Sequence, residues 1–132
     1  MYDKTLVIEQ LQNIEGALIR VLDRTWDIET AEEFALTPHG MDMLDVATIK
    51  LMACGEEISK IEKRTKGTLL SKYPEIQWQK IIDMRNFVAH DYFRVRAEVI
   101  FETVKNNVRP LLTTVQKIIT DLNNEIQLNP KT

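Results

Sequence analysis

Apolar side chains recur along this chain at alternating spacings of four and three residues, which is the period of one face of an α-helix. The first such stripe lies within residues 5–22 and consists of Val7, Leu11, Ile14, Leu18 and Val21. A second begins near Asp42 and consists of Leu44, Ala47, Leu51, Cys54, Ile58 and Ile61. Both stretches are predicted to be long helices, each with one buried face.

Residues 23–41 are predicted to connect these two helices. Thr30 is followed three residues later by Glu33, the spacing of a capping box, and this pair predicts a short helical turn. Pro38 is predicted to end that turn, because a residue before proline is biased away from helical backbone angles. His39 falls in a Pro-His-Gly sequence and is predicted to be a loop residue without a functional role.

The second half of the chain carries the remaining apolar stripes. After a short helical piece over residues 68–73, Pro74 is predicted to take the first position of a new helix, where proline is favoured. The apolar side of this helix is predicted to be Trp78, Ile81, Ile82 and either Phe87 or Val88. A further stripe comprises Ala97, Ile100, Phe101, Val104 and Val108. Pro110 is predicted to open a last helix with Leu112, Val115, Ile119, Leu122 and Ile126, and residues 127–132 to be frayed.

No stretch shows the period-two alternation of a β-strand, so the predicted fold class is all-α, a bundle of four to five main helices. A chain of 132 residues is expected to form a single domain, over residues 1–132. Cys54 is the single cysteine, which excludes an intrachain disulfide, and its place on an apolar stripe predicts a small buried side chain. Because the N-terminus lacks a signal-peptide pattern and no apolar run could span a membrane, the cytoplasm is the expected location.

The formal net charge of −3 argues against broad electrostatic binding to nucleic acid. If RNA is the substrate, its positively charged contact must be local, and the densest basic neighbourhood consists of Lys80, Arg85, Arg94 and Arg96. The alternative is that these residues form ordinary solvated helix surface.

Arg85, Asn86, His90 and Tyr92 form the one group of residues in this sequence that unites a cation, an amide, an imidazole and a phenol within eight positions. A guanidinium offers a rigid fork of donors that fits a phosphate, and a histidine can take or give a proton near neutral pH. These are the minimum requirements for cutting a phosphodiester. On an ideal helix the first three span an arc of roughly 140°.

A purely structural role is the alternative for these residues: His90 would complement a helix C-terminus, and Arg85 would pair with Asp83 or Asp91. Attack of a ribose 2′-hydroxyl on the adjacent phosphate benefits from both a base and an acid, yet this motif supplies one titrating imidazole per chain. A two-fold homodimer would supply two. No His, Asp and Glu set has the spacing of a known metal site, so no metal and no cofactor are expected.

The segment from Tyr73 to Phe93, with its Arg-x4-His-x-Tyr pattern, resembles HepT, a toxin of the HEPN class. The similarity extends to Cys54-Gly55-Glu56 and to residues 101–104 and 108–112, while residues 1–40 match only loosely. The resemblance implies an all-helical homodimer acting as a metal-independent endoribonuclease, with RNA rather than DNA as substrate and no membrane partner. It also implies a neighbouring minimal nucleotidyltransferase, MntA, as antitoxin.

In that family the motif's arginine and histidine are catalytic, which implies catalytic roles for Arg85 and His90. The motif's tyrosine accepts adenylyl groups from ATP, which implies that Tyr92 is the site of inhibitory modification. Asn86 is expected to position the substrate or the histidine, unless it is a plain surface residue. Glu56 is a further candidate for the cleft, although an ordinary exposed helix glutamate is its default interpretation.

Two other functions are compatible with this sequence. HEPN-like bundles also serve as non-catalytic partners of nucleotidyltransferases, where they bind nucleotides or substrates; such a protein would leave RNA intact. The third possibility is a helical interaction protein in which the motif is accidental. Fold alone never assigns function, but four suitable residues in one short segment favour the ribonuclease.

Overall fold

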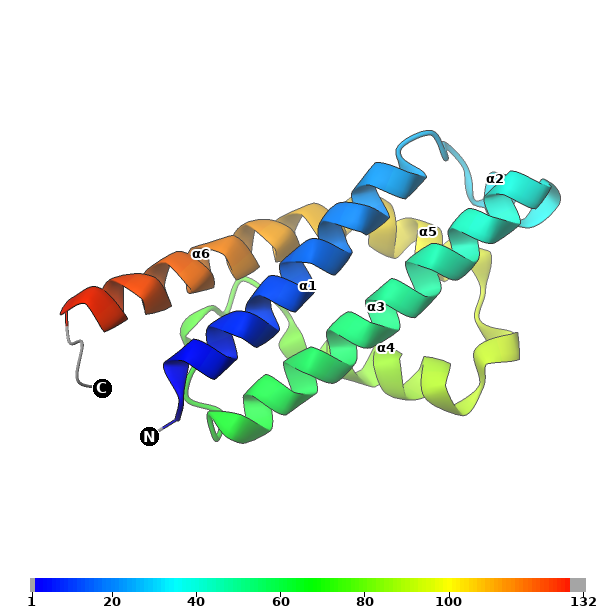
Figure 1. The fold of residues 1–132 in the computed structure, drawn as a ribbon. Helices are drawn as coiled ribbons and strands as arrows, with labels where there is room; N and C mark the ends of the chain where they lie inside the picture. Colours follow the sequence, from blue (N-terminus) through cyan, green and yellow to red (C-terminus); the bar gives the residue numbers. More distant parts are fainter. Residues whose placement is uncertain (1, 129–132) are drawn as a thin grey trace.

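The structure is a computed structural model that describes residues 2–128, and every regular element in that range is helical (Figure 1). The elements are α1 (Lys4–Thr25), α2 (Ala31–Leu36), α3 (Pro38–Arg64), η1 (Leu70–Lys72), α4 (Trp78–His90), η2 (Tyr92–Arg94), α5 (Ala97–Asn106) and α6 (Val108–Leu128). The predicted all-α fold class is therefore confirmed.

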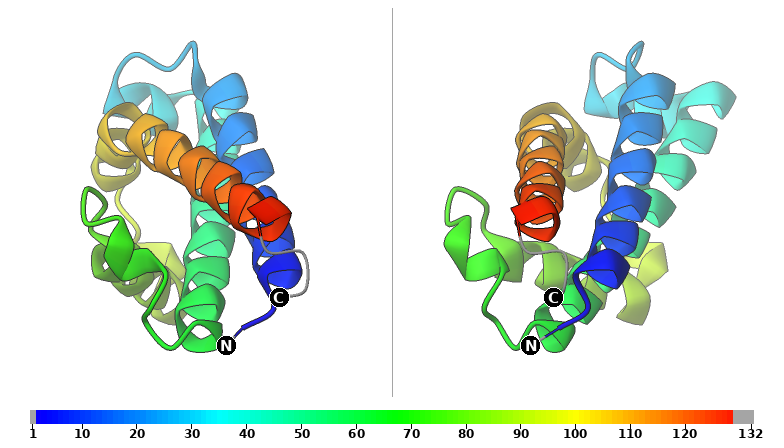
Figure 2. Two further views of the ribbon diagram at one scale, coloured as in Figure 1. Left: turned by 90° about the vertical axis from the view of Figure 1, so that its left-hand side faces the viewer. Right: turned by 60° about the vertical axis from the view of Figure 1, so that its left-hand side comes forward.

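The centre of the fold is α1, which packs against α3 on one side and α6 on the other (Figures 1 and 2). All five residues of the first predicted stripe are buried: Val7, Leu11, Ile14, Leu18 and Val21. On α3 the predicted stripe is buried from Ala47 to Ile61, while Leu44 is half-buried. Because one core is built from these stripes, helical periodicity was sufficient to predict its main layers.

The start of α3 differs from the prediction, because this helix begins at Pro38 and not near Asp42. Thr37 is its N-cap, and its hydroxyl accepts a hydrogen bond from the Gly40 N–H at 2.9 Å. Proline is tolerated at the first helical position, where its missing N–H would have no intrahelical partner anyway. His39 consequently lies in the first turn of α3 and not in a loop, with its Nε2 3.2 Å from Asp27 Oδ2.

The short helix α2 lies where the capping box predicted it. The Thr30 hydroxyl accepts a hydrogen bond from the Glu33 N–H at 3.4 Å. The Glu33 carboxylate accepts in turn from the Glu29 N–H at 3.3 Å, one residue before the cap. Phe34 enters the core from α2 and meets Phe101 edge to face, with ring centroids 6.2 Å apart. This contact joins α2 to α5.

The prediction that Pro74 begins a helix was wrong, because α4 begins at Trp78 and Pro74 lies in a turn. The buried Trp78 indole donates to the Tyr73 carbonyl oxygen at 3.0 Å. The Tyr73 hydroxyl donates to Asp121 on α6 at 2.6 Å. The turn is thus held closed by two aromatic side chains that both reach the core, and the helix can start only after it.

The last helix is also longer than predicted, since α6 begins at Val108 and places Pro110 within its first turn. Its fully buried apolar residues are Val108, Leu111, Val115, Ile118 and Leu122, whereas the predicted Leu112, Ile119 and Ile126 are half-buried at the edge of the core. Residues 127 and 128, expected to be frayed, are helical, and residues 129–132 lie outside the described range. None of the described helices combines the length and apolarity needed to cross a lipid bilayer.

Candidate functional site

Gly55 allows α4 to lie directly against α3. A Cβ atom at this position would lie 2.6 Å from Arg85 Cβ and 3.1 Å from the Ile81 carbonyl oxygen. Both distances are too short for a stable contact, so only glycine permits this approach of the two helices.

Arg85 is held between the two helices, with a third of its side chain exposed. One terminal nitrogen donates to Asn86 Oδ1 at 3.0 Å, and the other lies 3.9 Å from Glu56 Oε2. The Nε–H is buried and has no hydrogen-bond partner among residues 2–128. The guanidinium is thus oriented by Asn86 and α3, and its exposed edge can accept a ligand.

The ion pairs that would have given Arg85 a purely structural role are not formed. Asp83 instead accepts a hydrogen bond from Gln79 Nε2 at 2.9 Å, and Asp91 pairs with Arg94 at 2.9 Å. The partner of Arg85 is Glu56, whose separation of 3.9 Å makes this a loose contact. A partly exposed ion pair of that length contributes little to stability, so it leaves the guanidinium available for a phosphate.

His90 is the last residue of α4 and is exposed. Within residues 2–128 its imidazole makes no hydrogen bond and no ion pair. It follows Arg85 by five positions, which corresponds to about 7.5 Å along the helix axis and roughly 140° around it. The structure therefore brings Asn86 to Arg85, but it places His90 on the outer side of α4, away from the contact with α3.

Tyr92 lies in η2, directly after α4, and its hydroxyl donates to Asp45 Oδ1 on α3 at 3.0 Å. This hydrogen bond, followed by partial burial, raises the pKa of the Tyr92 phenol above its ordinary value. The ring packs edge to face on Phe93, with centroids 6.0 Å apart. Asp45 was missed by the sequence analysis, because nothing local to an exposed acidic residue on α3 indicates a contact 47 positions away.

The basic residues near the motif are partly paired with carboxylates. Arg94 Nε is 2.9 Å from Asp91, and Arg96 Nε is 3.5 Å from Glu98. Both arginine side chains are largely exposed, and exposed ion pairs of this kind contribute little energy. They can therefore exchange a carboxylate for the phosphate of a bound nucleic acid at little cost.

Exposed apolar side chains also surround the motif. Of the two candidates for the last apolar position of α4, Val88 is buried and Phe87 is 54% exposed. Phe93 is 97% exposed. On α3, Met41 and Ile49 are exposed one helical turn to either side of Asp45. Apolar surface of this kind beside charged residues is typical of sites that contact other macromolecules.

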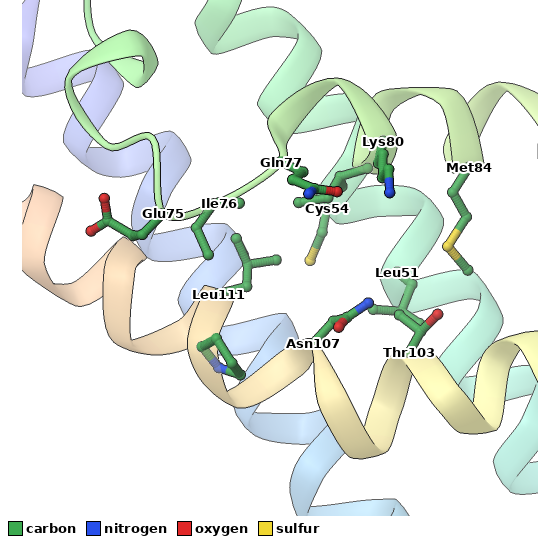
Figure 3. A pocket seen from close by; sticks show the side chains of 12 residues that line it. Leu51, Cys54, Glu75, Ile76, Gln77, Lys80, Met84, Thr103, Asn107 and Leu111 are labelled. Carbon is green, nitrogen blue, oxygen red and sulfur yellow. The ribbon is translucent and has the colours of Figure 1, made fainter.

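A separate pocket of about 480 Å³ lies between α4 and the helices α3, α5 and α6 (Figure 3). Its lining joins α3, α4, the turn before α4, and α5 and α6; the apolar part includes Leu51, Cys54, Ile81, Met84 and Leu111. Ile81 precedes His90 by nine positions and is thus roughly 180° from it around the helix. Cys54 is 1% exposed, which confirms it as a small buried side chain, and burial raises the pKa of its thiol to about 12.

Comparison with known families agrees with this architecture. A family described as "Ribonuclease HepT-like" matches residues 8–118, which is most of the chain and includes α4 and the whole motif. The chain therefore belongs to the HepT-like ribonuclease family.

Two relatives from Methanocaldococcus jannaschii illustrate the similarity. The protein named "Putative RNase MJ0127" is 29% identical over 70 residues, covering 53% of this chain and 58% of that protein. "Putative RNase MJ0125" is 31% identical over 72 residues, covering 54% and 62%. The chain thus spans about three fifths of the length of the curated relatives it matches. No solved structure gave a significant match to this chain.

Proposed function

We propose that this protein is an endoribonuclease toxin of the HepT type, which cuts RNA without a metal ion. The strongest support is the position of two residues of the motif. The Arg85 guanidinium is held by Asn86 but remains partly exposed, and His90 is exposed at the end of the same helix. Membership of the HepT-like ribonuclease family supports the same reaction.

The proposed reaction is a transesterification at phosphorus. The ribose 2′-oxygen attacks the adjacent phosphate, a new O–P bond forms, and the bond to the 5′-oxygen of the next nucleotide breaks. His90 removes the proton from the 2′-hydroxyl or returns one to the leaving 5′-oxygen, and Arg85 stabilises the negative charge on the phosphate oxygens. Asn86 keeps the guanidinium in place. DNA is not a substrate, because it lacks the attacking hydroxyl.

A homodimer completes this site in the proposal. Arg85 and His90 of one protomer point in directions roughly 140° apart, so a second copy is needed to place an imidazole and a guanidinium on both sides of one phosphate. The exposed Phe87 and Phe93 provide apolar surface for such an interface. A protein that sediments strictly as a monomer and still cleaves RNA would contradict this part of the proposal.

Tyr92 is the proposed off switch, modified with adenylate from ATP by a partner nucleotidyltransferase of the MntA type in the cytoplasm. The phenol is partly exposed and lies two positions after His90. A phosphodiester-linked adenylate would add negative charge and bulk where the RNA phosphate must bind. The transferase is thereby an antitoxin that acts by covalent modification.

The test is cleavage of a single-stranded RNA by the purified protein in the presence of EDTA. We expect cleavage products with 2′,3′-cyclic phosphate ends, and no cleavage of the same oligonucleotide with 2′-deoxyribose. His90→Ala and Arg85→Ala should each reduce the rate by at least about 100-fold. His39→Ala is the matched control, because it removes the other histidine, which is far along the chain on α3, and should leave the rate unchanged. Equal rates for wild type and His90→Ala would refute the proposal.

The pocket behind α4 favours a second candidate function, a non-catalytic nucleotide-binding partner of a nucleotidyltransferase. Its apolar lining is rimmed by polar side chains, which include Gln77, Lys80 and Asn107 (Figure 3). A lining of this composition and size suits a small planar ligand with polar edges. In that case the protein would bind a nucleotide in equilibrium dialysis and leave RNA intact.

A further inference from the structure

The turn that follows α4 has few attachments to the rest of the molecule. No residue of η2 is buried, and the backbone hydrogen bonds of the turn are local. The Asp91 N–H donates to the Phe87 carbonyl at 3.0 Å, and the Val95 N–H donates to the Tyr92 carbonyl at 3.2 Å. The ion pair between Arg94 and Asp91 is also local. These contacts shape the turn, but they do not attach it to α3.

The hydrogen bond from Tyr92 to Asp45 does attach it to α3. It joins residues 47 positions apart, and among residues 2–128 it is the side-chain hydrogen bond that links η2 to the rest of the bundle. The half-buried Val95 adds an apolar contact at the far end of the turn. Since the Asp91 N–H is bonded to the last turn of α4, a shift of η2 would also be felt at His90.

We infer that Asp45 is a positioning residue of the candidate site: by accepting the hydrogen bond from Tyr92 it holds η2 on α3 and so sets the place of His90. The inference rests on the proposed function for its catalytic consequence. The attachment of η2 to α3 by this hydrogen bond, called the tether below, does not depend on that function. It is a property of the hydrogen bond and of the weak attachment of the turn.

The direction of the hydrogen bond from Tyr92 to Asp45 has a chemical consequence for the proposed adenylylation of Tyr92. An ionised carboxylate can only accept hydrogen bonds, so the phenol must be the donor. A phosphodiester on the Tyr92 oxygen replaces the donated proton and places negative charge beside the Asp45 carboxylate. The attractive contact becomes a repulsive one. Modification of Tyr92 therefore releases the turn from α3 and displaces His90, in addition to covering it.

The tether can be measured by hydrogen exchange of the backbone amides of Asp91, Arg94 and Val95 in the full-length protein, followed by NMR. Tyr92→Phe and Asp45→Ala each remove the bond, and we expect either to accelerate exchange roughly threefold to tenfold, the effect of one net hydrogen bond. Asp45→Asn keeps an oxygen acceptor and should exchange more slowly than Asp45→Ala. The double variant should exchange no faster than the single variants, because both remove the same bond.

Asp42→Ala is the matched control, since it removes an exposed carboxylate from the same helix one turn earlier, and it should leave these amides unchanged. Wild-type exchange in both Tyr92→Phe and Asp45→Ala would overturn the inference. Faster exchange in Asp42→Ala as well would also overturn it, because the effect would then be one of general charge.

The positioning role is tested separately on RNA cleavage. Asp45→Ala should lower kcat and leave KM within roughly twofold, because it acts on the place of His90 and not on substrate binding. Asp45→Asn should restore part of kcat. If wild type does not cleave RNA, the proposed function fails while the exchange experiment still reports on the tether. If exchange accelerates but kcat does not change, the tether stands and the positioning role is refuted.

Discussion

The bundle formed by α1, α2, α3, α5 and α6 and the motif segment formed by α4 and η2 are built differently. In the bundle each long helix has a continuous buried stripe. On α1, for example, eight residues are buried. In the motif segment only Trp78 and Val88 are buried, and η2 has no buried residue. The bundle therefore supplies most of the fully buried core, whereas the motif segment packs on α3 mainly through partly buried side chains of α4.

This difference has a chemical reason. Side chains with the proposed role of meeting a phosphate must stay accessible, so a segment that carries Arg85, His90 and Tyr92 has few positions left for burial. Sites of this kind are commonly drawn from the less stable parts of a fold. The contacts that keep α4 and η2 in place include the packing at Gly55, the buried Trp78 and Val88, and the hydrogen bond from Tyr92 to Asp45.

The largest expected contrast compares two phenylalanines, one from each region. Phe34 is fully buried against Phe101, so Phe34→Ala should lower the free energy of unfolding by about 3 to 5 kcal/mol. Phe87 is 54% exposed, and Phe87→Ala should change it by less than about 1 kcal/mol. Urea denaturation followed by circular dichroism measures both. Similar losses in the two variants would show that the motif segment belongs to the main core.

Two glycines provide the next contrast. Gly55→Ala should destabilise the protein by about 1 to 3 kcal/mol, because the new Cβ meets Arg85 Cβ and the Ile81 carbonyl, which can move only with α4. It should also reduce RNA cleavage. Gly16 is likewise in a helix but has nothing within 4 Å of an added Cβ, so Gly16→Ala should stabilise by about 0.4 to 1 kcal/mol. A Gly55→Ala variant as stable as wild type would argue against close packing of α4.

The smallest contrast concerns the response to pH. Burial raises the pKa of the Cys54 thiol from 9.0 to about 12, so the unfolded chain loses this proton at lower pH than the folded protein does. The contribution of the neutral thiol to the free energy of unfolding is fully present below pH 9. It decreases as pH rises towards 12, by about 1.4 kcal/mol per pH unit at most. The comparison is the stability of wild type minus that of Cys54→Ala, measured between pH 8 and pH 10.5. A difference that does not change with pH would show that the thiol is not buried in solution.

Predictions from the sequence were confirmed where the signal was local. The stripes from Val7 to Val21 and from Ala47 to Ile61 follow the period of a helix, and they became the faces of α1 and α3 that form the core. For the last apolar position of α4 the sequence left Phe87 and Val88 as alternatives, because periodicity permits either residue to face inward, and the structure buries Val88. The predicted starts of α3 and α4 were wrong, because α3 begins at Pro38 and not near Asp42, and Pro74 lies in a turn before α4. A proline is compatible with both helix starts and turns, and neighbouring contacts decide between them.

By itself, then, the sequence determined the helical fold class and the buried stripes, and it supplied the residues proposed for the chemistry, because each depends on spacings within a few turns of one helix. Only the tertiary structure decided that Arg85 packs on Gly55, that its ion-pair partner is Glu56, and that Asp45 accepts from Tyr92. The reason is physical. These relations depend on how α4 lies across α3, and that placement arises from packing between segments some 30 to 47 residues apart, which no local pattern encodes.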